Sequence, residues 1–254
     1  MASDATSGRP APTLSIVVPT YKESNNVPIL FERIAAALGG MPWEMIVVDD
    51  DSPDGTSNVA FRLAAADSRL RCLRRVNRSG LAGAVIEGWM SSSADFVAVI
   101  DGDLQHDESI LLAMYQALAK GSGDLVIGTR LRDASEGTLS PARQQLSDLG
   151  AWFFRRIAGA TVSDPMSGFF MIRREIVSRL APRLSPDGFK ILVDVILSAG
   201  GGLNIVEIPY AFRKRHAGES KLTPLVGIDF LGVVVHHASA GTLPTRFVLF
   251  AMIG

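Results

Sequence analysis

Short apolar runs alternate with longer mixed segments through the first half of the chain. The apolar runs have the length of strands, and they fall at residues 14–18, 44–48, 70–75, 95–100 and 124–128. The segments between them predict helices at residues 26–38, 57–67, 81–92 and 110–120. Near-continuous apolar strands are typical of a sheet that is covered on both faces. The alternation therefore predicts a mostly parallel, Rossmann-like α/β sheet with right-handed crossovers.

The second half of the chain is less regular. It predicts helices at 140–158 and 189–198, strands at 168–173 and 204–208, and a turn at the glycines 200–202. Residues 223–239 are apolar apart from one acid and two adjacent histidines. This pattern suggests an amphipathic helix that lies on a membrane surface.

We expect three parts in the chain. Residues 1–12 lack the apolar centre of a signal peptide, so we expect a disordered segment there and a catalytic part that faces the cytoplasm. Residues 13–222 are expected to form the main domain. Residues 223–254 would hold the interfacial helix and the start of a possible membrane domain, because an apolar run begins after Arg246. No segment reaches the roughly 20 apolar residues that span a bilayer.

Composition narrows the possible functions. The chain is 47% hydrophobic and 20% charged, which fits a globular core. Its net charge of −1 gives no reason to expect nucleic-acid binding, so any electrostatic argument must be local. Cys72 is the one cysteine, which excludes an internal disulfide and a cysteine metal cluster. Its apolar surroundings predict a buried structural thiol.

Polar residues follow three of the predicted strands, in the segments 19–23, 49–55 and 101–107. Because ligands bind at the carboxyl ends of parallel strands, we expect these segments to meet at one edge of the sheet. Carboxylates crowded in this way raise one another's pKa values. A bound divalent cation would relieve that repulsion.

Asp101 and Asp103 stand two positions apart after the fourth strand, and Gln105 continues the spacing. In an extended segment, alternate side chains point to the same side. Hard cations such as Mg²⁺ or Mn²⁺ prefer oxygen ligands of this kind. The alternative is that aspartates in loops form turns and helix caps, and we favour that alternative for Asp54-Gly55 alone. For the other three residues the pattern predicts a metal site.

A local cationic stretch stands near the end of the predicted domain, at Arg213, Lys214, Arg215 and Lys221. Arginine presents a planar fork that suits phosphate oxygens. We interpret Lys214 as a solvated residue, and Arg215 and Lys221 as phosphate contacts. His106 lies beside the acidic motif, and we do not expect it to act directly in catalysis.

Seven motifs carry a resemblance to a known family. They occur in family order within residues 14–222: VVPTYKESNN (17–26), VVDDDSPDGT (47–56), DGDLQH (101–106), GTR (128–130), SGFF (167–170), GFKILVD (188–194) and GESKL (218–222). The chain resembles glycosyltransferase family 2 enzymes, which have a GT-A fold. Within that family it is similar to the dolichol-phosphate (polyprenyl-phosphate) mannose synthases.

The resemblance implies a role at each matching position. It implies that a nucleotide-sugar donor is held by Pro19, Tyr21, Glu23, Val48, Asp50, Asp101, Gly102, Arg215 and Lys221. It implies that Mg²⁺ or Mn²⁺ is held by Asp101, Asp103 and Gln105. It implies that the acceptor is held by Arg130, Arg143, Ser147, Ser167 and Lys190. The main catalytic contributions would come from Asp103, Arg130, Arg143 and Lys221.

The reaction implied by the resemblance is an inverting transfer of a sugar to a lipid phosphate. The expected donor is GDP-mannose, and the expected acceptor is a polyprenyl or dolichyl phosphate at the cytoplasmic face of a membrane. A phosphate monoester is largely dianionic at neutral pH, since its second pKa is about 6. It can therefore attack the sugar without a dedicated general base. Positioning and charge stabilisation would carry the catalysis.

Other functions stay open. A polyprenyl-phosphate glucosyltransferase, or a related enzyme that uses a UDP-sugar, would share most of these motifs. Asp51, Asp194 and the segment 77–84 depart from the family pattern, and these departures bear on the sugar and nucleotide more than on the reaction. A non-catalytic module that binds nucleotide sugars and a soluble transferase acting on a polysaccharide are further alternatives. A dehydrogenase is disfavoured, because residues 19–26 lack its glycine-rich turn.

Overall fold

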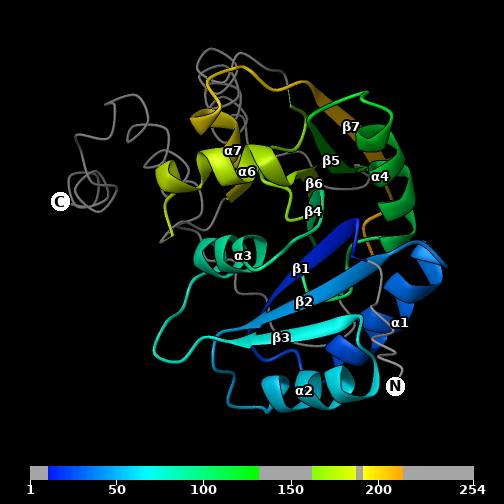
Figure 1. Cartoon of the computed structure of the whole chain (residues 1–254), viewed down its shortest axis with the longest axis vertical. Helices are drawn as coiled ribbons and strands as arrows, with labels where there is room; N and C mark the ends of the chain where they lie inside the picture. Colours follow the sequence, from blue (N-terminus) through cyan, green and yellow to red (C-terminus); the bar gives the residue numbers. More distant parts are fainter. Residues whose placement is uncertain (1–10, 132–161, 187–190, 214–254) are drawn as a thin grey trace, which may run out of the picture.

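Seven strands form one sheet in the order β3-β2-β1-β4-β6-β5-β7, and this sheet is the frame of the computed structural model (Figure 1). The structure describes residues 11–131, 162–186 and 191–213. Its strands are β1 (Leu14–Thr20), β2 (Trp43–Asp49), β3 (Leu70–Arg74), β4 (Phe96–Val99), β5 (Leu125–Arg130), β6 (Phe170–Arg173) and β7 (Ile205–Tyr210). Neighbouring strands are parallel except at β6, which runs antiparallel to both β4 and β5.

Helices cover both faces of the sheet (Figure 1). One face carries α3 (Leu81–Met90), α6 (Arg174–Leu180) and α7 (Ile191–Ser198). The other face carries α1 (Asn26–Leu38) and α4 (Leu111–Ala119), with α2 (Thr56–Ala66) packed beside α1 and β3. Two short 3₁₀ helices complete the described elements, η1 (Glu108–Ile110) and η2 (Ala181–Arg183).

The predicted α/β architecture is confirmed. The strands and helices of the first half lie within two residues of their predicted bounds. Strand β6 forms at the predicted place, while α6, which follows it directly, was not predicted. The helices expected at 140–158 and 223–239 lie outside the described residues, as does the apolar run after Arg246. Among the helices that are described, none is long and apolar enough to cross a membrane.

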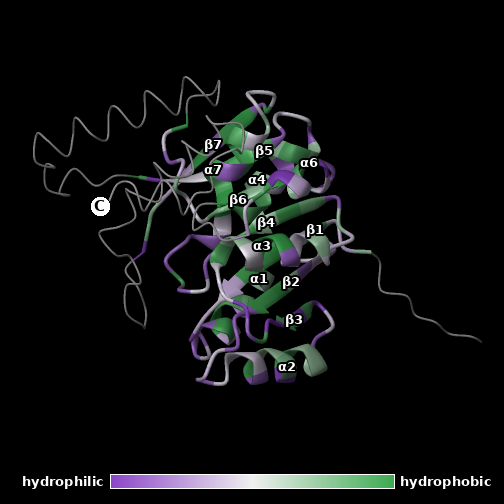
Figure 2. Ribbon diagram, turned by 90° about the vertical axis from the view of Figure 1, so that its left-hand side faces the viewer, coloured by the Kyte–Doolittle hydropathy of each residue, from purple (hydrophilic) through white to green (hydrophobic). Residues whose placement is uncertain are grey.

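The core has two halves, one on each face of the sheet. Val17 of β1 packs toward α3, whereas its neighbours Ile16 and Val18 belong to the cluster under α1 and α4. This alternation follows from the period of two along a strand. Because both faces are covered, both sets of side chains are apolar, and the strands are coloured as hydrophobic along most of their length (Figure 2).

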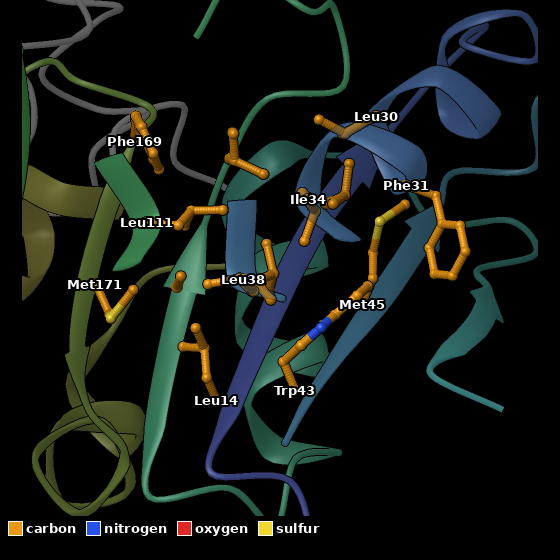
Figure 3. Packing of buried hydrophobic residues seen from close by; sticks show 14 of the residues in the cluster. Leu14, Leu30, Phe31, Ile34, Leu38, Trp43, Met45, Leu111, Phe169 and Met171 are labelled. Carbon is orange, nitrogen blue, oxygen red and sulfur yellow. The ribbon is translucent and has the colours of Figure 1, made fainter. Parts of the chain in front are cut away.

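Helix α1 shows how one half of the core is filled. Leu30, Ile34 and Leu38 follow helical spacing and face Leu14 of β1 and Met45 of β2 (Figure 3). All five side chains are buried. Each such burial stabilises the fold by about 1.5–3 kcal/mol.

Cys72 lies on β3 and packs, partly buried, against the core half under α1 and α4. Burial and the nearby charge of Asp49 raise the pKa of its thiol to about 12. The thiol therefore stays protonated and unreactive. This agrees with the prediction of a structural cysteine.

Helix α3 approaches the sheet most closely at Gly88. A Cβ atom there would lie 2.9 Å from Cγ2 of Val17 and 3.1 Å from Cγ2 of Val48. Valine side chains have one strongly preferred rotamer in a given backbone, so these methyl groups have little freedom to move away. A glycine at this position is therefore required by packing and not by backbone conformation.

We predict that Gly88→Ala lowers the free energy of unfolding by about 1–3 kcal/mol, because an added methyl group over-packs the interface between α3 and β1. Urea unfolding of the full chain measures the change. Gly40→Ala is the matched control, since a Cβ at Gly40 meets nothing within 4 Å, and its effect should stay within about 0.5 kcal/mol. Equal stability of the two variants would contradict the close packing described here.

Candidate functional site

One edge of the sheet collects the polar ends of the strands. Strands β1, β2, β4, β5 and β7 end there, and the antiparallel β6 begins there. The loop after β1 is tied to the loop after β2, because the amides of Lys22 and Glu23 donate to Ser52 Oγ (2.9 Å) and Thr56 Oγ1 (3.0 Å). Gly102, after β4, lies close to the end of β1 and the loop after it, because a Cβ there would be 3.4 Å from Thr20 Cγ2 and 3.5 Å from Glu23 Cγ. The predicted meeting of the three polar segments is confirmed.

Asp49 ends β2 and organises the loop that follows it. Its buried carboxylate accepts hydrogen bonds from Thr20 Oγ1 (3.0 Å), from the amide (3.0 Å) and hydroxyl (2.5 Å) of Ser52, and from the hydroxyl of Ser57. A buried carboxylate needs such donors to offset its desolvation. Asp49 therefore holds the site's framework in place.

Asp54 stabilises the same loop. Burial alone would raise its pKa, but hydrogen bonds from Thr56 and Ser24 outweigh burial and lower it. Asp54 accepts from the hydroxyl of Thr56 at 2.6 Å, and Gly55 follows with a φ of 81°. The interpretation of Asp54-Gly55 as a turn and helix start is confirmed.

Asp50 is held by a buried arginine that the sequence analysis missed. Its Oδ1 lies 2.6 Å from an Nη of Arg75, and its Oδ2 accepts from the amide of Gly80 at 2.8 Å. Arg75 is only 4% exposed and also contacts Glu87 (3.1 Å) and the carbonyl of Gly80. The sequence did offer a signal for this pairing: Arg75 is a charged residue at the end of a predicted strand, just before a loop that contains a glycine.

The other residues predicted to bind the nucleotide-sugar donor differ in how exposed their side chains are. Tyr21 is 42% exposed at the edge, with Lys22 Nζ 5.3 Å from its ring centroid. Pro19 is partly buried within β1, and Glu23 accepts from Asn26 Nδ2 at 2.7 Å. Val48 is fully buried in the sheet, and its contact with a donor stays a prediction. Sheet packing occupies that side chain completely.

Asp101 and Asp103 lie on the turn that follows β4. Leu104 has a φ of 64° and buries its side chain, so this segment is a turn and not the extended run assumed from the spacing. Asp103 Oδ1 accepts from the amide of Gln105 at 3.2 Å, and the Gln105 side-chain amide donates to the carbonyl of Arg213 at 3.2 Å. The turn still brings both carboxylates to the carboxyl end of β4.

These residues suit a hard divalent cation that shares its ligands with a substrate. Within the described part of the chain, no group of three or more His, Cys, Asp or Glu side chains is arranged to hold a metal. Mg²⁺ is commonly held by one or two carboxylates together with phosphate oxygens of the substrate. The chemistry of two aspartates and a glutamine amide fits that arrangement.

Arg213 joins the end of β7 to the acidic turn. Its guanidinium donates to Glu108 Oε2 (2.5 Å), Asp107 Oδ1 (2.7 Å) and the carbonyl of His106 (3.0 Å), while its amide donates to the carbonyl of Gln105 (2.8 Å). Glu108 is 2% exposed, so this arginine neutralises a buried acid. Arg213, one of the four residues of the predicted cationic stretch, therefore has a structural role inside the fold.

Arg130 ends β5 and lies opposite Tyr210 of β7 in the strand register. Its Nε donates to Asp164 Oδ2 at 2.8 Å, and its guanidinium carbon lies 5.3 Å from the centre of the Phe212 ring. The side chain is 45% exposed. Arg130 is thus a positioned guanidinium that an anion at the edge can reach.

Ser167 is buried and uses its hydroxyl inside the fold. It donates to the carbonyl of Gly128 at 2.7 Å and accepts from the amide of Phe169 at 3.2 Å. These bonds support the turn that leads into β6. The remaining predicted site residues lie outside the described residues: Arg143, Ser147, Lys190, Arg215 and Lys221.

Comparisons with known proteins agree with this fold. A sequence model of the family described as Glycosyl transferase family 2 matches residues 15–181. A dolichol-phosphate mannosyltransferase of Pyrococcus furiosus is 36% identical over 95% of this chain and 68% of that protein. A polyprenol monophosphomannose synthase of Mycolicibacterium smegmatis is 29% identical over 87% of this chain and 84% of that protein.

Solved structures show the same fold. Glucosyl-3-phosphoglycerate synthase from Mycobacterium tuberculosis, in complex with Mn²⁺, uridine diphosphate and glucosyl-3-phosphoglycerate, aligns with a TM-score of 0.67. The alignment covers 90% of this chain and 80% of that one at 21% sequence identity. A complex of the same enzyme with Mg²⁺ and uridine diphosphate gives a TM-score of 0.68 at 20% identity, again over 90% and 80% of the two chains. The GT-A architecture expected from the sequence is confirmed.

We predict that Arg75→Leu lowers the free energy of unfolding by about 3–5 kcal/mol at neutral pH, because it leaves Asp50 and Glu87 without their buried partner. The control is Arg78→Leu, which removes an arginine from the same Glu87 but at an exposed position, and it should cost at most about 1 kcal/mol. Chemical unfolding of the two variants measures the difference.

The loss should also depend on pH. Burial already raises the pKa of Asp50 despite the opposing charge of Arg75. Without Arg75 that pKa rises further, and a carboxyl with a raised folded pKa loses stability as pH rises through it. The deficit of Arg75→Leu should therefore be smallest near pH 4 and grow toward pH 7. A deficit that is flat with pH, or one unchanged by adding Asp50→Asn, would contradict the pairing.

Proposed function

We propose, from the premise that this chain belongs to glycosyl transferase family 2, that it transfers mannose to the phosphate of a polyprenyl or dolichyl phosphate. The observation that carries the proposal is the shared edge of the sheet. Asp101 and Asp103 follow β4 at that edge, and Arg130 ends β5 there. The names of the relatives supply the sugar and the lipid acceptor. GDP-mannose is the donor that we assign.

Asp101, Asp103 and Gln105 would hold a divalent cation, Mg²⁺ or Mn²⁺. When bound, such a cation neutralises the charge of a departing nucleotide diphosphate. Two features of this chain support the assignment: the two carboxylates stand on one turn, and the turn is tied down through Arg213. Structures with the same fold hold Mn²⁺ or Mg²⁺ together with uridine diphosphate.

The loops after β1 and β2 would bind the nucleoside of the donor. Tyr21 offers an exposed aromatic face at this edge, and Asp50 offers a carboxylate whose position Arg75 and Gly80 already fix. Such fixed groups need no reorganisation when a ligand binds, which favours affinity. The predicted contacts of Pro19 and Glu23 belong to the same region.

Arg130 would bind the acceptor phosphate. The guanidinium of Arg130 is paired with Asp164, and the arginine side chain is half exposed. An ion pair at such a position contributes little to stability, so an anionic ligand can readily replace Asp164. A phosphate dianion makes stronger, charge-assisted bonds to the same nitrogens. Arg143, Ser147, Ser167 and Lys190 complete the acceptor site in the proposal, and Arg215 and Lys221 complete the contacts to the diphosphate.

The acceptor needs no general base from the protein, because its phosphate is already charged at neutral pH. The residues of the chain then hold the donor and the acceptor phosphate in an orientation that allows the transfer. A lipid acceptor implies action at a membrane surface, and we assign the catalytic domain to the cytoplasmic side.

We predict that the full chain transfers labelled mannose from GDP-mannose to a short polyprenyl phosphate, that chelation of divalent cations abolishes the transfer, and that Mn²⁺ or Mg²⁺ restores it. Asp103→Asn should reduce kcat/KM by at least about 100-fold, since it removes a charge that acts on the diphosphate. Asp67→Asn changes an aspartate paired with Arg69, near the start of β3, and should leave activity unchanged.

The same assay separates the alternatives. Transfer from UDP-glucose in place of GDP-mannose would replace the proposed donor with that of a glucosyltransferase. Binding of GDP-mannose without any transfer would point to a non-catalytic module. Transfer that persists in excess chelator would refute the metal assignment.

We predict that Arg130→Lys raises the KM for the polyprenyl phosphate about 10-fold or more while leaving the KM for the donor within about twofold, because lysine keeps the charge but not the bidentate fork. Arg78→Lys, at an exposed position beside Glu87, is the control. A change confined to the donor KM would place Arg130 on the other substrate.

A further inference from the structure

We propose that His106, fixed by Tyr210, is a positioning residue that holds the Asp101 carboxylate in the orientation needed to bind a divalent cation. The inference rests on the proposed function, since it concerns the same metal site. It gives a role to a histidine for which the sequence alone indicated none, and to a tyrosine at the end of the edge strand β7 that no motif included.

Both ring nitrogens of His106 are engaged. Nε2 lies 3.0 Å from Asp101 Oδ2, and Nδ1 lies 2.5 Å from the hydroxyl oxygen of Tyr210. The histidine is 4% exposed and Tyr210 is 3% exposed. The result is a buried chain of hydrogen bonds from β7 to the turn after β4.

The chemistry of the three groups fixes the direction of these bonds. An ionised carboxylate can only accept, so Nε2 of His106 must carry the proton that points to Asp101. In the neutral imidazole, Nδ1 then has a lone pair and must accept, which makes Tyr210 the donor. Burial raises the pKa of the Tyr210 hydroxyl, and this keeps the donor protonated. A buried tyrosine thus selects one tautomer of the histidine.

Aromatic packing restricts the histidine ring. Its centroid lies 5.3 Å from Phe169, 5.7 Å from Tyr210 and 5.5 Å from Phe212, at interplanar angles between 50° and 72°. Rings on three sides leave little room for the imidazole to turn. Its Nε2 therefore presents a stationary donor to Asp101.

Gly168 confines Asp101 from another side. A Cβ atom at Gly168 would lie 2.8 Å from Cγ of Asp101, so the backbone of this turn touches the carboxylate directly. Asp101 is one-third exposed on a turn, where an unrestrained side chain samples several rotamers. The histidine and the glycine together favour the observed orientation, with Oδ2 bonded to the imidazole.

Packing alone does not explain this arrangement. An apolar ring would fill the same aromatic pocket without the desolvation cost of two buried nitrogens. Instead, Tyr210 donates to His106 and His106 donates to Asp101, which is a carboxylate of the proposed metal site. Groups that orient metal ligands in this way typically change metal affinity by about 10–100-fold when removed.

The first test reads the tautomer in the full, metal-free protein. Side-chain ¹⁵N NMR of His106 should show a protonated Nε2 and an unprotonated, hydrogen-bonded Nδ1. The absence of a proton on Nε2 would overturn the proposal. This result does not depend on metal binding or on transfer activity.

The second test measures Mn²⁺ affinity by electron paramagnetic resonance in the presence of GDP. His106→Leu should raise the Kd for Mn²⁺ by about 10–100-fold. His106→Gln, whose amide nitrogen can replace Nε2 as a donor, should recover most of the affinity. Tyr210→Phe should weaken binding by a smaller factor, while the matched control Tyr115→Phe, whose ring packs on Phe96, should not.

The outcomes separate this inference from the proposed function. A His106→Leu protein that keeps its native near-ultraviolet circular dichroism and binds Mn²⁺ as tightly as the wild type would refute the role of His106 alone. Failure of the wild type to bind Mn²⁺ would refute the metal site, and the role of His106 with it. If His106→Leu does not fold, the tautomer and the Tyr210→Phe affinity still decide.

Discussion

Negative charge concentrated at one edge of a parallel sheet is the constraint on which the rest of this structure depends. Four of the aspartates at this edge accept hydrogen bonds from different donors within the chain. Asp49 binds hydroxyl groups, Asp50 binds a guanidinium, Asp54 binds loop donors and Asp101 binds an imidazole. The hydrogen bonds that satisfy these charges also hold the loops after β2 and β4 in place.

The acids at the edge therefore divide into two groups. Asp49 is buried and Asp54 is exposed, and both accept hydrogen bonds that build the loop after β2, whereas Asp101 and Asp103 stand partly buried on the turn after β4. The arginines divide in the same way. Arg75 and Arg213 are bound to acids inside the fold, while Arg130 remains half exposed at the end of β5. Neither charge type nor exposure alone separates framework from site, since the Arg213 side chain is 39% exposed and that of Arg130 45%; the partners of each side chain have to be known.

The antiparallel β6 has a particular consequence for the site. Because it runs against its neighbours, its first residues, and not its last, lie at the functional edge. Gly168 and Phe169 are thereby placed against Asp101 and His106. A fully parallel sheet would have put the end of this strand there instead. The reversal lets a glycine press on the carboxylate and an aromatic ring pack on the histidine.

Local patterns along the chain were enough to predict the strands and helices of the first half, the α/β class and the clustering of the three polar loops. Apolar runs, glycine turns and strand-end acids are local signals, and the regular alternation leaves few topologies. The sequence also indicated the family, because each family motif is a short contiguous segment that can be recognised without the fold. Helix α6 was missed, because it follows β6 without an intervening turn.

Only the tertiary structure decided what each polar side chain does. The pairing of Asp50 with Arg75 spans 25 positions, and that of His106 with Tyr210 spans 104. The burial of Val48 and the hydrogen bond from the Ser167 hydroxyl to the carbonyl of Gly128 are likewise visible only in the fold. Partners and burial depend on segments that are distant along the chain, and local patterns carry no information about them.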